Sequence, residues 1–459
     1  MKKFIVSILA VFLFQACDQK PSNDYIVLTG TITDSPSPEF RLVKRNSGTP
    51  QLLITLDENG SFSDTLRTGT GLYILYDPRN RADLYLTQGG TYHLEVDGKN
   101  FKPSAKVTGT DPGASNYLIT KYARLAKVRG DYAEFNKLNE VDYKAKSKLI
   151  KNNLINYLDS FPNIPKEFAK SEREELQYSH LLNLMKYENL HQRFTEKSTF
   201  NVSSDFLSEL KDVDYTDEAA YKMPGSYKDL VALHYQAEAA ALAANEQVDQ
   251  YLAKLKVFSN IPNDHIKNSL LVSAANFDIG YTDDIDTYFQ EFLAASTSTQ
   301  NNETIQAKYD ALKKLSKGAP SPVFTDYVNH AGGTNSLTDY KGKYVYIDVW
   351  ATWCGPCLAE VPALKEVEKQ YHGKNIEFLS ISIDTEPARE AWRKMVTDKE
   401  LGGVQLLADQ AWQSAFISAY EINSIPRFII IDPDGNIVNS NAPRPSDKKL
   451  LNIFNELGI

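Results

Sequence analysis

Cysteine is scarce in this chain of 459 residues, which contains only Cys17, Cys354 and Cys357. A framework of structural disulfides, the device that stabilises many exported domains, is therefore excluded. The chain also lacks a basic tract, and its formal net charge is −9, which argues against a nucleic-acid partner. Its N-terminal apolar run, at 4–14, is too short to span a bilayer.

That apolar run has the features of a secretory signal. Lys2 and Lys3 precede it, and Ala16 and Cys17 follow it. A Cys after a small residue at the end of such a run resembles the bacterial lipoprotein box, in which this Cys is acylated and becomes the mature N-terminus. We therefore expect 1–17 to be a signal peptide ending at Cys17, and an exported protein anchored to a membrane by lipid, with a periplasmic location. The alternative is a Cys17 that lies inside an ordinary cleaved signal.

Length and hydrophobic patterning predict three folded parts. Single hydrophobic cores stop growing at roughly 250 to 300 residues, so the chain exceeds one ordinary domain. Residues 24–112 alternate as strands do, with turn signals between them, and predict a β-rich antiparallel sandwich or barrel. Residues 113–317 change to the helical period and predict an all-α region. Residues 318–459 alternate strand and helix patterns, which predicts an α/β domain with a mixed sheet.

A Cys-x-x-Cys motif concentrates the chemistry in this last part. An apolar segment at 344–350 predicts a central strand buried on both faces. A helical pattern starts just after it, so Cys354 is expected at a helix N-terminus, where amide N–H groups favour a thiolate. Cys357, one turn further on, is close enough to resolve a mixed disulfide. Between the two cysteines, Gly355 and Pro356 permit a tight turn into the helix.

Metal binding is the alternative for any Cys-x-x-Cys pair. A zinc site needs two more ligands, and the sequence has no other Cys pair and no His-x-x-x-His. We therefore predict a redox pair that needs neither a metal nor another cofactor.

The Trp-Cys-Gly-Pro-Cys segment at 353–357 resembles thioredoxin, and more specifically the TlpA-like (ResA-like) family of exported thiol-disulfide oxidoreductases. The resemblance covers 318–459 and implies a thioredoxin-like fold. It implies that Asp348 is a buried proton acceptor for the resolving Cys357. It also implies that Pro426 is a cis-proline beside the cysteine pair and that Ile425 offers its backbone to a substrate. The remaining residues expected to bind substrate are Trp353, Gly355 and Pro356.

Two positions depart from the family pattern. Many members carry Asn where this chain has Asp348, and Arg427 follows Pro426 where Thr is usual, which leaves the electrostatics of the substrate groove open. Glu360 falls where some relatives also place an acid, although a solvated helix face is an equal reading of that residue.

These observations predict a thiol-disulfide oxidoreductase of the bacterial cell envelope that reduces or exchanges disulfides in exported proteins. Its partners would be exported proteins with disulfides or thiols, an envelope or membrane electron donor, and the membrane through lipid on Cys17. The direction of electron flow depends on the redox partner and stays open. One alternative is a peroxiredoxin-like thiol peroxidase, whose Pro-x-x-x-Thr-x-x-Cys setting fails here because Ala351 lies three residues before Cys354. Another is a binding protein with a passenger thioredoxin domain.

Overall fold

The computed structural model describes residues 24–45, 52–282 and 284–459. The predicted signal peptide and Cys17 lie outside these residues. The chain forms two compact units, Met1–Leu233 and His234–Ile459. The division between them falls inside helix α7 (Ser226–Glu246), so the predicted domain limits at 112/113 and 317/318 stay predictions.

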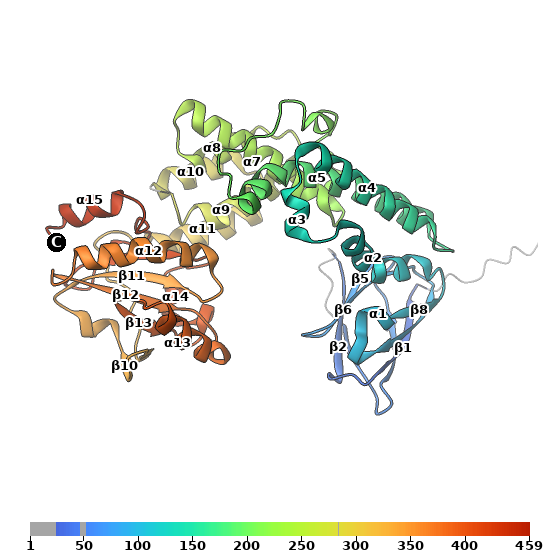
Figure 1. The fold of residues 1–459 in the computed structure, drawn as a ribbon, viewed down its shortest axis with the longest axis horizontal. Coiled ribbons are helices and arrows are strands. Elements are labelled where there is room, and N and C mark those ends of the chain that lie inside the picture. Colours follow the sequence, from blue (N-terminus) through green and yellow to red (C-terminus); the bar gives the residue numbers. More distant parts are fainter. Residues whose placement is uncertain (1–23, 46–51, 283) are drawn as a thin grey trace, which may run out of the picture. The chain divides into compact units, whose positions relative to one another are not determined.

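Two four-stranded sheets form the N-terminal part of the described chain (Figure 1). One has the order β4 (Ser61–Leu66), β1 (Ile26–Thr33), β7 (Thr91–Asp97), β8 (Lys106–Gly109). The other has the order β3 (Leu52–Thr55), β2 (Glu39–Lys44), β5 (Gly71–Tyr76), β6 (Arg81–Leu86). Alternate side chains of both sheets are buried in one shared apolar core. The β-rich class is confirmed, but the expectation of a purely antiparallel arrangement is wrong, because β1 pairs with β7 in parallel.

Helices make up the rest of the first unit. After the short α1 (Phe101–Ser104), they are α2 (Gly113–Arg129), α3 (Tyr132–Lys137), α4 (Glu140–Asp159), α5 (Lys166–Thr195) and α6 (Glu218–Lys222). Polar side chains begin several of them: Asp131 accepts a hydrogen bond from the Glu134 amide, and Asn139 accepts one from the Asp142 amide. Such N-caps satisfy amide groups that the first helical turn leaves without partners.

The second unit continues the helical region with α8 (Gln250–Ser259), α9 (Asp264–Asp278), α10 (Ile285–Ala295) and α11 (Thr299–Lys313). Phe289 of α10 stacks on Tyr309 of α11 with 4.3 Å between ring centroids. The all-α middle region is confirmed as a class of structure.

A mixed seven-stranded sheet forms the C-terminal part of this unit (Figure 1). Its order is β10 (Thr334–Asn335), β9 (Tyr327–Asn329), β13 (Val404–Leu407), β12 (Ile376–Ser382), β11 (Tyr344–Trp350), β14 (Arg427–Ile431), β15 (Ile437–Asn439). Strand β11 lies inside the sheet, parallel to β12 and antiparallel to β14. The helices around the sheet are α12 (Gly355–Gln370), α13 (Arg389–Asp398), α14 (Ala415–Ala419) and α15 (Lys449–Glu456).

Strand β11 supplies side chains to two cores, one on each face of the sheet. Ile347 and Val349 belong to a core that includes apolar residues of α13 and α14. Tyr346 belongs to a core that includes residues of α12 and α15. Because side chains alternate along a strand, Asp348 lies on the same face as Tyr346, under α12. This mixed sheet with helices on both faces is the predicted thioredoxin-like class.

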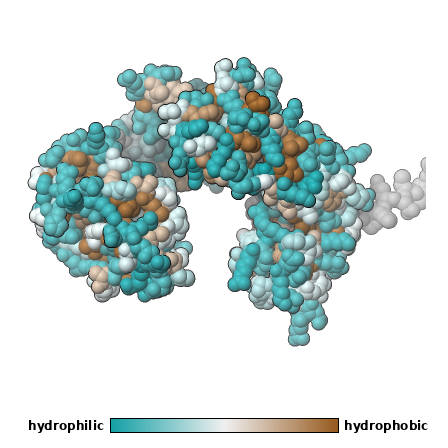
Figure 2. Space-filling model, in the orientation of Figure 1, coloured by the Kyte–Doolittle hydropathy of each residue, from teal (hydrophilic) through white to brown (hydrophobic). Residues whose placement is uncertain are grey.

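The surface in Figure 2 is mainly hydrophilic, with apolar residues dispersed between polar ones. Among the described residues, no helix combines the length and the apolar character needed to cross a membrane.

Candidate redox site

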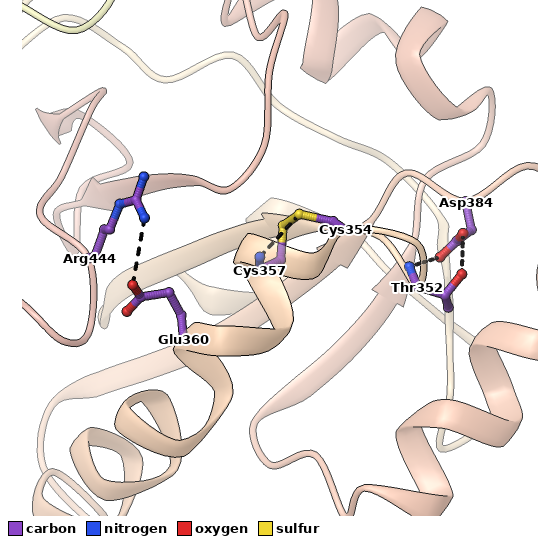
Figure 3. Close-up of a disulfide and its surroundings, with 6 residues drawn as sticks. All are labelled: Thr352, Cys354, Cys357, Glu360, Asp384 and Arg444. Carbon is purple, nitrogen blue, oxygen red and sulfur yellow. Dashed lines mark hydrogen bonds and ion pairs between the residues drawn. A yellow bond between two sulfur atoms is a disulfide. The ribbon is translucent and has the colours of Figure 1, made fainter. Parts of the chain in front are cut away.

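Cys354 and Cys357 lie where the segment after β11 turns into α12 (Figure 3). Cys354 is the N-cap residue, and its Sγ accepts a hydrogen bond from the Cys357 amide at 3.1 Å. The two residues form a disulfide with 5.3 Å between their Cα atoms. Each is only 4% exposed, so solvent exposure does not distinguish them in this oxidised pair. The hydrogen bond from the Cys357 amide does distinguish the two cysteines, because it would favour negative charge on Cys354.

The surface next to the disulfide carries the predicted substrate-binding residues. Gly355 and Pro356 are exposed, and Trp353 is 61% exposed, which is unusual for so large an apolar side chain. Trp412 lies beside it, with 6.5 Å between the ring centroids. The two indoles give the surface near the disulfide an apolar character.

A buried aspartate that the sequence analysis missed fixes the loop before Cys354. Asp384, 1% exposed, accepts hydrogen bonds from the Thr352 amide at 2.9 Å and from the Thr352 hydroxyl at 2.8 Å (Figure 3). Ser382, at the end of β12, donates a third bond to the same carboxylate at 2.8 Å. A fully hydrogen-bonded buried carboxylate is a rigid support, so the loop that carries Cys354 is held to the neighbouring strand.

Asp348 is buried in the sheet beneath α12, as the resemblance implies. Its Oδ1 has no hydrogen-bond partner in the described part of the chain. Burial, reinforced by the negative charges of Glu368 and Glu360, raises its pKa to about 8. A cavity of about 10 Å³, room for roughly one water molecule, is lined by Asp348, Cys357 and Glu368 among others. Asp348 and the second cysteine therefore share one small space.

Two acids of α12, Glu368 and Glu360, act on Asp348 through their charge, and Glu368 also lines the cavity. Burial raises the pKa of Glu368 to about 7, and this residue was absent from the sequence analysis. Glu360 is 9% exposed and accepts bonds from the Ser446 amide at 3.1 Å and the Ser446 hydroxyl at 2.9 Å. Arg444 pairs with it at 3.7 Å (Figure 3). Glu360 is therefore a buried, hydrogen-bonded acid, and the reading as a solvated helix face is wrong.

The loop before β14 forms the other part of the site. The Ile425–Pro426 peptide bond is cis, as the resemblance implies for Pro426. Ile425 packs against the apolar core that contains both cysteines. Arg427 is 4% exposed, and its Nη1 donates to the Gly280 carbonyl oxygen at 2.9 Å. The departure at Arg427 therefore places a buried guanidinium against the turn after α9.

Comparisons with known proteins place this site in a family. A protein-family model described as Redoxin matches residues 316–454. The thiol-disulfide oxidoreductase ResA of Bacillus cereus is 31% identical over 125 residues, which is 27% of this chain and 68% of ResA. The chain belongs to the ResA-like family of thiol-disulfide oxidoreductases. ResA of Bacillus subtilis is 25% identical over 133 residues, 29% of this chain and 70% of that protein.

The Redoxin match lies in the C-terminal part of the chain, where the resemblance over 318–459 was predicted. Two solved structures are similar over slightly less than a third of the chain. The thioredoxin domain of a Bacteroides vulgatus thiol-disulfide oxidoreductase is 27% identical, covers 31% of this chain and 98% of that chain, and has a TM-score of 0.29. A Bacteroides fragilis thiol-disulfide oxidoreductase is 26% identical, covers 30% and 99% respectively, and has a TM-score of 0.27.

The two residues that sequence reasoning missed differ in how they could have been found. Asp384 directly follows an apolar strand pattern, so the rule that an isolated acid beside a buried strand is costly could have identified it. Glu368 lies among alternating acids and lysines on α12, and nothing in that pattern separates it from an exposed helix residue.

Proposed function

We propose that this ResA-like protein uses Cys354 and Cys357 as its redox pair to reduce or exchange disulfides in exported proteins of the bacterial envelope. The observation that carries the proposal is the disulfide at the N-terminus of α12, beside the exposed Trp353, with Ile425 packed against the same apolar core. An accessible apolar surface beside a reactive pair suits a protein substrate, because apolar contacts hold the substrate chain while sulfur chemistry proceeds.

In the reducing direction, the Cys354 thiolate attacks one sulfur of a substrate disulfide. A Cys354–substrate disulfide forms, and the second substrate sulfur leaves as a thiolate that takes up a proton. The helix N-terminus and the Cys357 amide lower the free energy of the attacking thiolate.

Cys357 then loses its proton and attacks Cys354 Sγ. The Cys354–Cys357 disulfide forms, and the first substrate sulfur leaves as a thiolate and is protonated. Two electrons have passed to the substrate, and an envelope electron donor must return them before the next cycle. Asp348 is suited to take the Cys357 proton, because both residues line one small cavity and a carboxyl whose pKa is raised to about 8 is a stronger base than an ordinary carboxylate.

Export and anchorage are part of the same proposal. The apolar run at 4–14 and Cys17 support a lipid-anchored protein of the cell envelope with a periplasmic location. There the protein would contact the membrane through lipid on Cys17 and take electrons from an envelope or membrane donor.

The test is reduction of insulin disulfides with dithiothreitol as the electron donor. The wild-type protein should accelerate precipitation of the insulin B chain, and Cys354→Ser should abolish this acceleration. Peroxide consumption measured in parallel tests the thiol-peroxidase alternative. Peroxide turnover without insulin reduction would overturn the proposal, and so would absence of both activities, which would favour a binding protein.

A further inference from the structure

The cis-proline loop is attached to the helical region of the same unit. Tyr281 lies just after α9, and its hydroxyl hydrogen-bonds with the Ser424 hydroxyl. Gly280, next to Tyr281, accepts a hydrogen bond from Arg427 at 2.9 Å. Gly280 and Tyr281, two consecutive residues of the turn after α9, therefore bind Arg427 and Ser424, the residues on either side of the Ile425–Pro426 pair.

Further contacts strengthen this attachment. The Arg427 guanidinium lies over the Tyr281 ring, with 4.3 Å from its carbon to the ring centroid, a favourable cation–π arrangement. The Asn423 side-chain amide donates to the Asn276 carbonyl oxygen at 3.1 Å. Lys308 of α11 donates to the same carbonyl oxygen. The loop is thus bonded to α9 through the Asn276 carbonyl oxygen and to the turn after α9, and Lys308 of α11 bonds to the same carbonyl oxygen.

Burying a guanidinium is costly unless its N–H groups find partners. Arg427 is 4% exposed, and the residue usual at this family position, Thr, is too short to reach Gly280. Arg427, which differs from the usual Thr, therefore has a partner within this chain: its longer side chain reaches the turn after α9.

We propose that Gly280 and Tyr281, with Arg427, are positioning residues for the redox reaction: they fix the cis-proline loop so that Ile425 presents its backbone to a protein substrate. The helical region then contributes to substrate affinity, although Gly280 and Tyr281 lie outside residues 316–454, which the Redoxin model matches. This inference rests on the proposed function, because it assumes that substrates bind along Ile425.

The experiment compares two substrates, insulin and the small disulfide 5,5′-dithiobis(2-nitrobenzoic acid), in the full-length protein. Tyr281→Phe removes only the hydroxyl that contacts Ser424 and keeps the ring under the guanidinium. Arg427→Thr removes the contact with Gly280, and Arg427→Lys restores part of it. Tyr309→Phe is the matched control, because its hydroxyl hydrogen-bonds with Asp286 in the same helical region, at 2.6 Å.

Tyr281→Phe and Arg427→Thr should raise the KM for insulin about threefold to tenfold, the range expected for a lost hydrogen bond. Arg427→Lys should recover part of the loss. Turnover of the small disulfide and the midpoint potential of the cysteine pair should not change, because neither depends on a docked chain. Amide hydrogen exchange in 423–427 should become faster in both variants and stay unchanged in Tyr309→Phe.

The outcomes separate this inference from the proposed function. If the wild-type protein does not reduce insulin, the proposed function fails first. If it does, and both variants keep the wild-type KM for insulin, the positioning role is wrong. Equal losses with both substrates, or a changed midpoint potential, would also overturn it, since the contacts would then act on the cysteine pair. Should Arg427→Thr unfold, Tyr281→Phe alone decides the matter.

Discussion

Replacing Asp348 by Asn should change the pH dependence of stability of the thioredoxin-like region. The pKa of Asp348 is raised from 3.8 to about 8 in the folded protein. Each pKa unit corresponds to about 1.4 kcal/mol, so ionising this carboxyl in place costs on the order of 5 kcal/mol. Between pH 4 and pH 8 the unfolded chain has lost this proton and the folded chain keeps it. Folding stability must therefore fall as pH rises through this window and level off above pH 8.

The side-chain amide of the Asp348→Asn variant has no such proton to lose, so this variant should gain stability relative to wild type as pH rises. The difference between the two proteins should be on the order of 5 kcal/mol larger at pH 9 than at pH 4. Urea unfolding followed by tryptophan fluorescence measures this directly, because all four tryptophans lie between 350 and 412 and report on this region alone. Glu368, with a pKa of about 7, adds a smaller decrease of stability with rising pH, and this decrease is present in both proteins.

The Asp348→Asn variant should also resolve the mixed disulfide more slowly. In the wild-type protein the resolution rate should rise with pH and level off above about pH 8, and in the variant this rise should be absent. Two stability curves that run parallel from pH 4 to pH 9 would refute the assignment of a buried ionisation to Asp348. If the stability curves differ but the two proteins have identical pH–rate profiles, the buried ionisation of Asp348 stands and only its catalytic role is refuted.

Three further outcomes are expected. Cys357→Ser should accumulate disulfide-linked complexes with partner proteins on non-reducing gels and Cys354→Ser almost none, because only Cys357 can resolve the intermediate; equal trapping by both would reverse the assignment of the nucleophile. Cys17→Ser should move the protein from the membrane to the soluble fraction or stall its processing, and unchanged fractionation would remove the lipid anchor. Glu368→Gln should lower the pKa of Asp348, since it deletes a nearby negative charge; an unchanged carboxyl titration by NMR would contradict this coupling.

Local patterns predicted the elements that carry the redox pair. The apolar segment at 344–350 is β11, and Cys354 is the N-cap of the following helix. Both features are set by residues that are close in sequence: the apolar run makes the strand, and Gly355 and Pro356 allow the turn into the helix. A resemblance to relatives added Asp348 and Pro426, whose partners are distant in the chain.

Contacts between distant segments were beyond the same reasoning. Alternation in 26–33 gives the buried face of β1 but says nothing about the direction of its partner, and β7 proved to be parallel. Arg427 meets Gly280, 147 residues earlier, and only tertiary structure shows that its guanidinium is buried. A charged residue at an unusual position indicates that its surroundings are unusual, but the sequence does not show which residues surround it.

The structure treats the two cysteines differently, although they are equally buried. Cys354 Sγ accepts the Cys357 amide at a helix N-terminus, and this favours an anion there. Cys357 instead lines the cavity shared with Asp348 and Glu368, where burial and the neighbouring carboxyl groups disfavour a second anion. The pair should therefore ionise in order, with Cys354 first and Cys357 only when a proton acceptor is ready. We therefore expect Cys354 to attack the substrate and Cys357 to resolve the mixed disulfide.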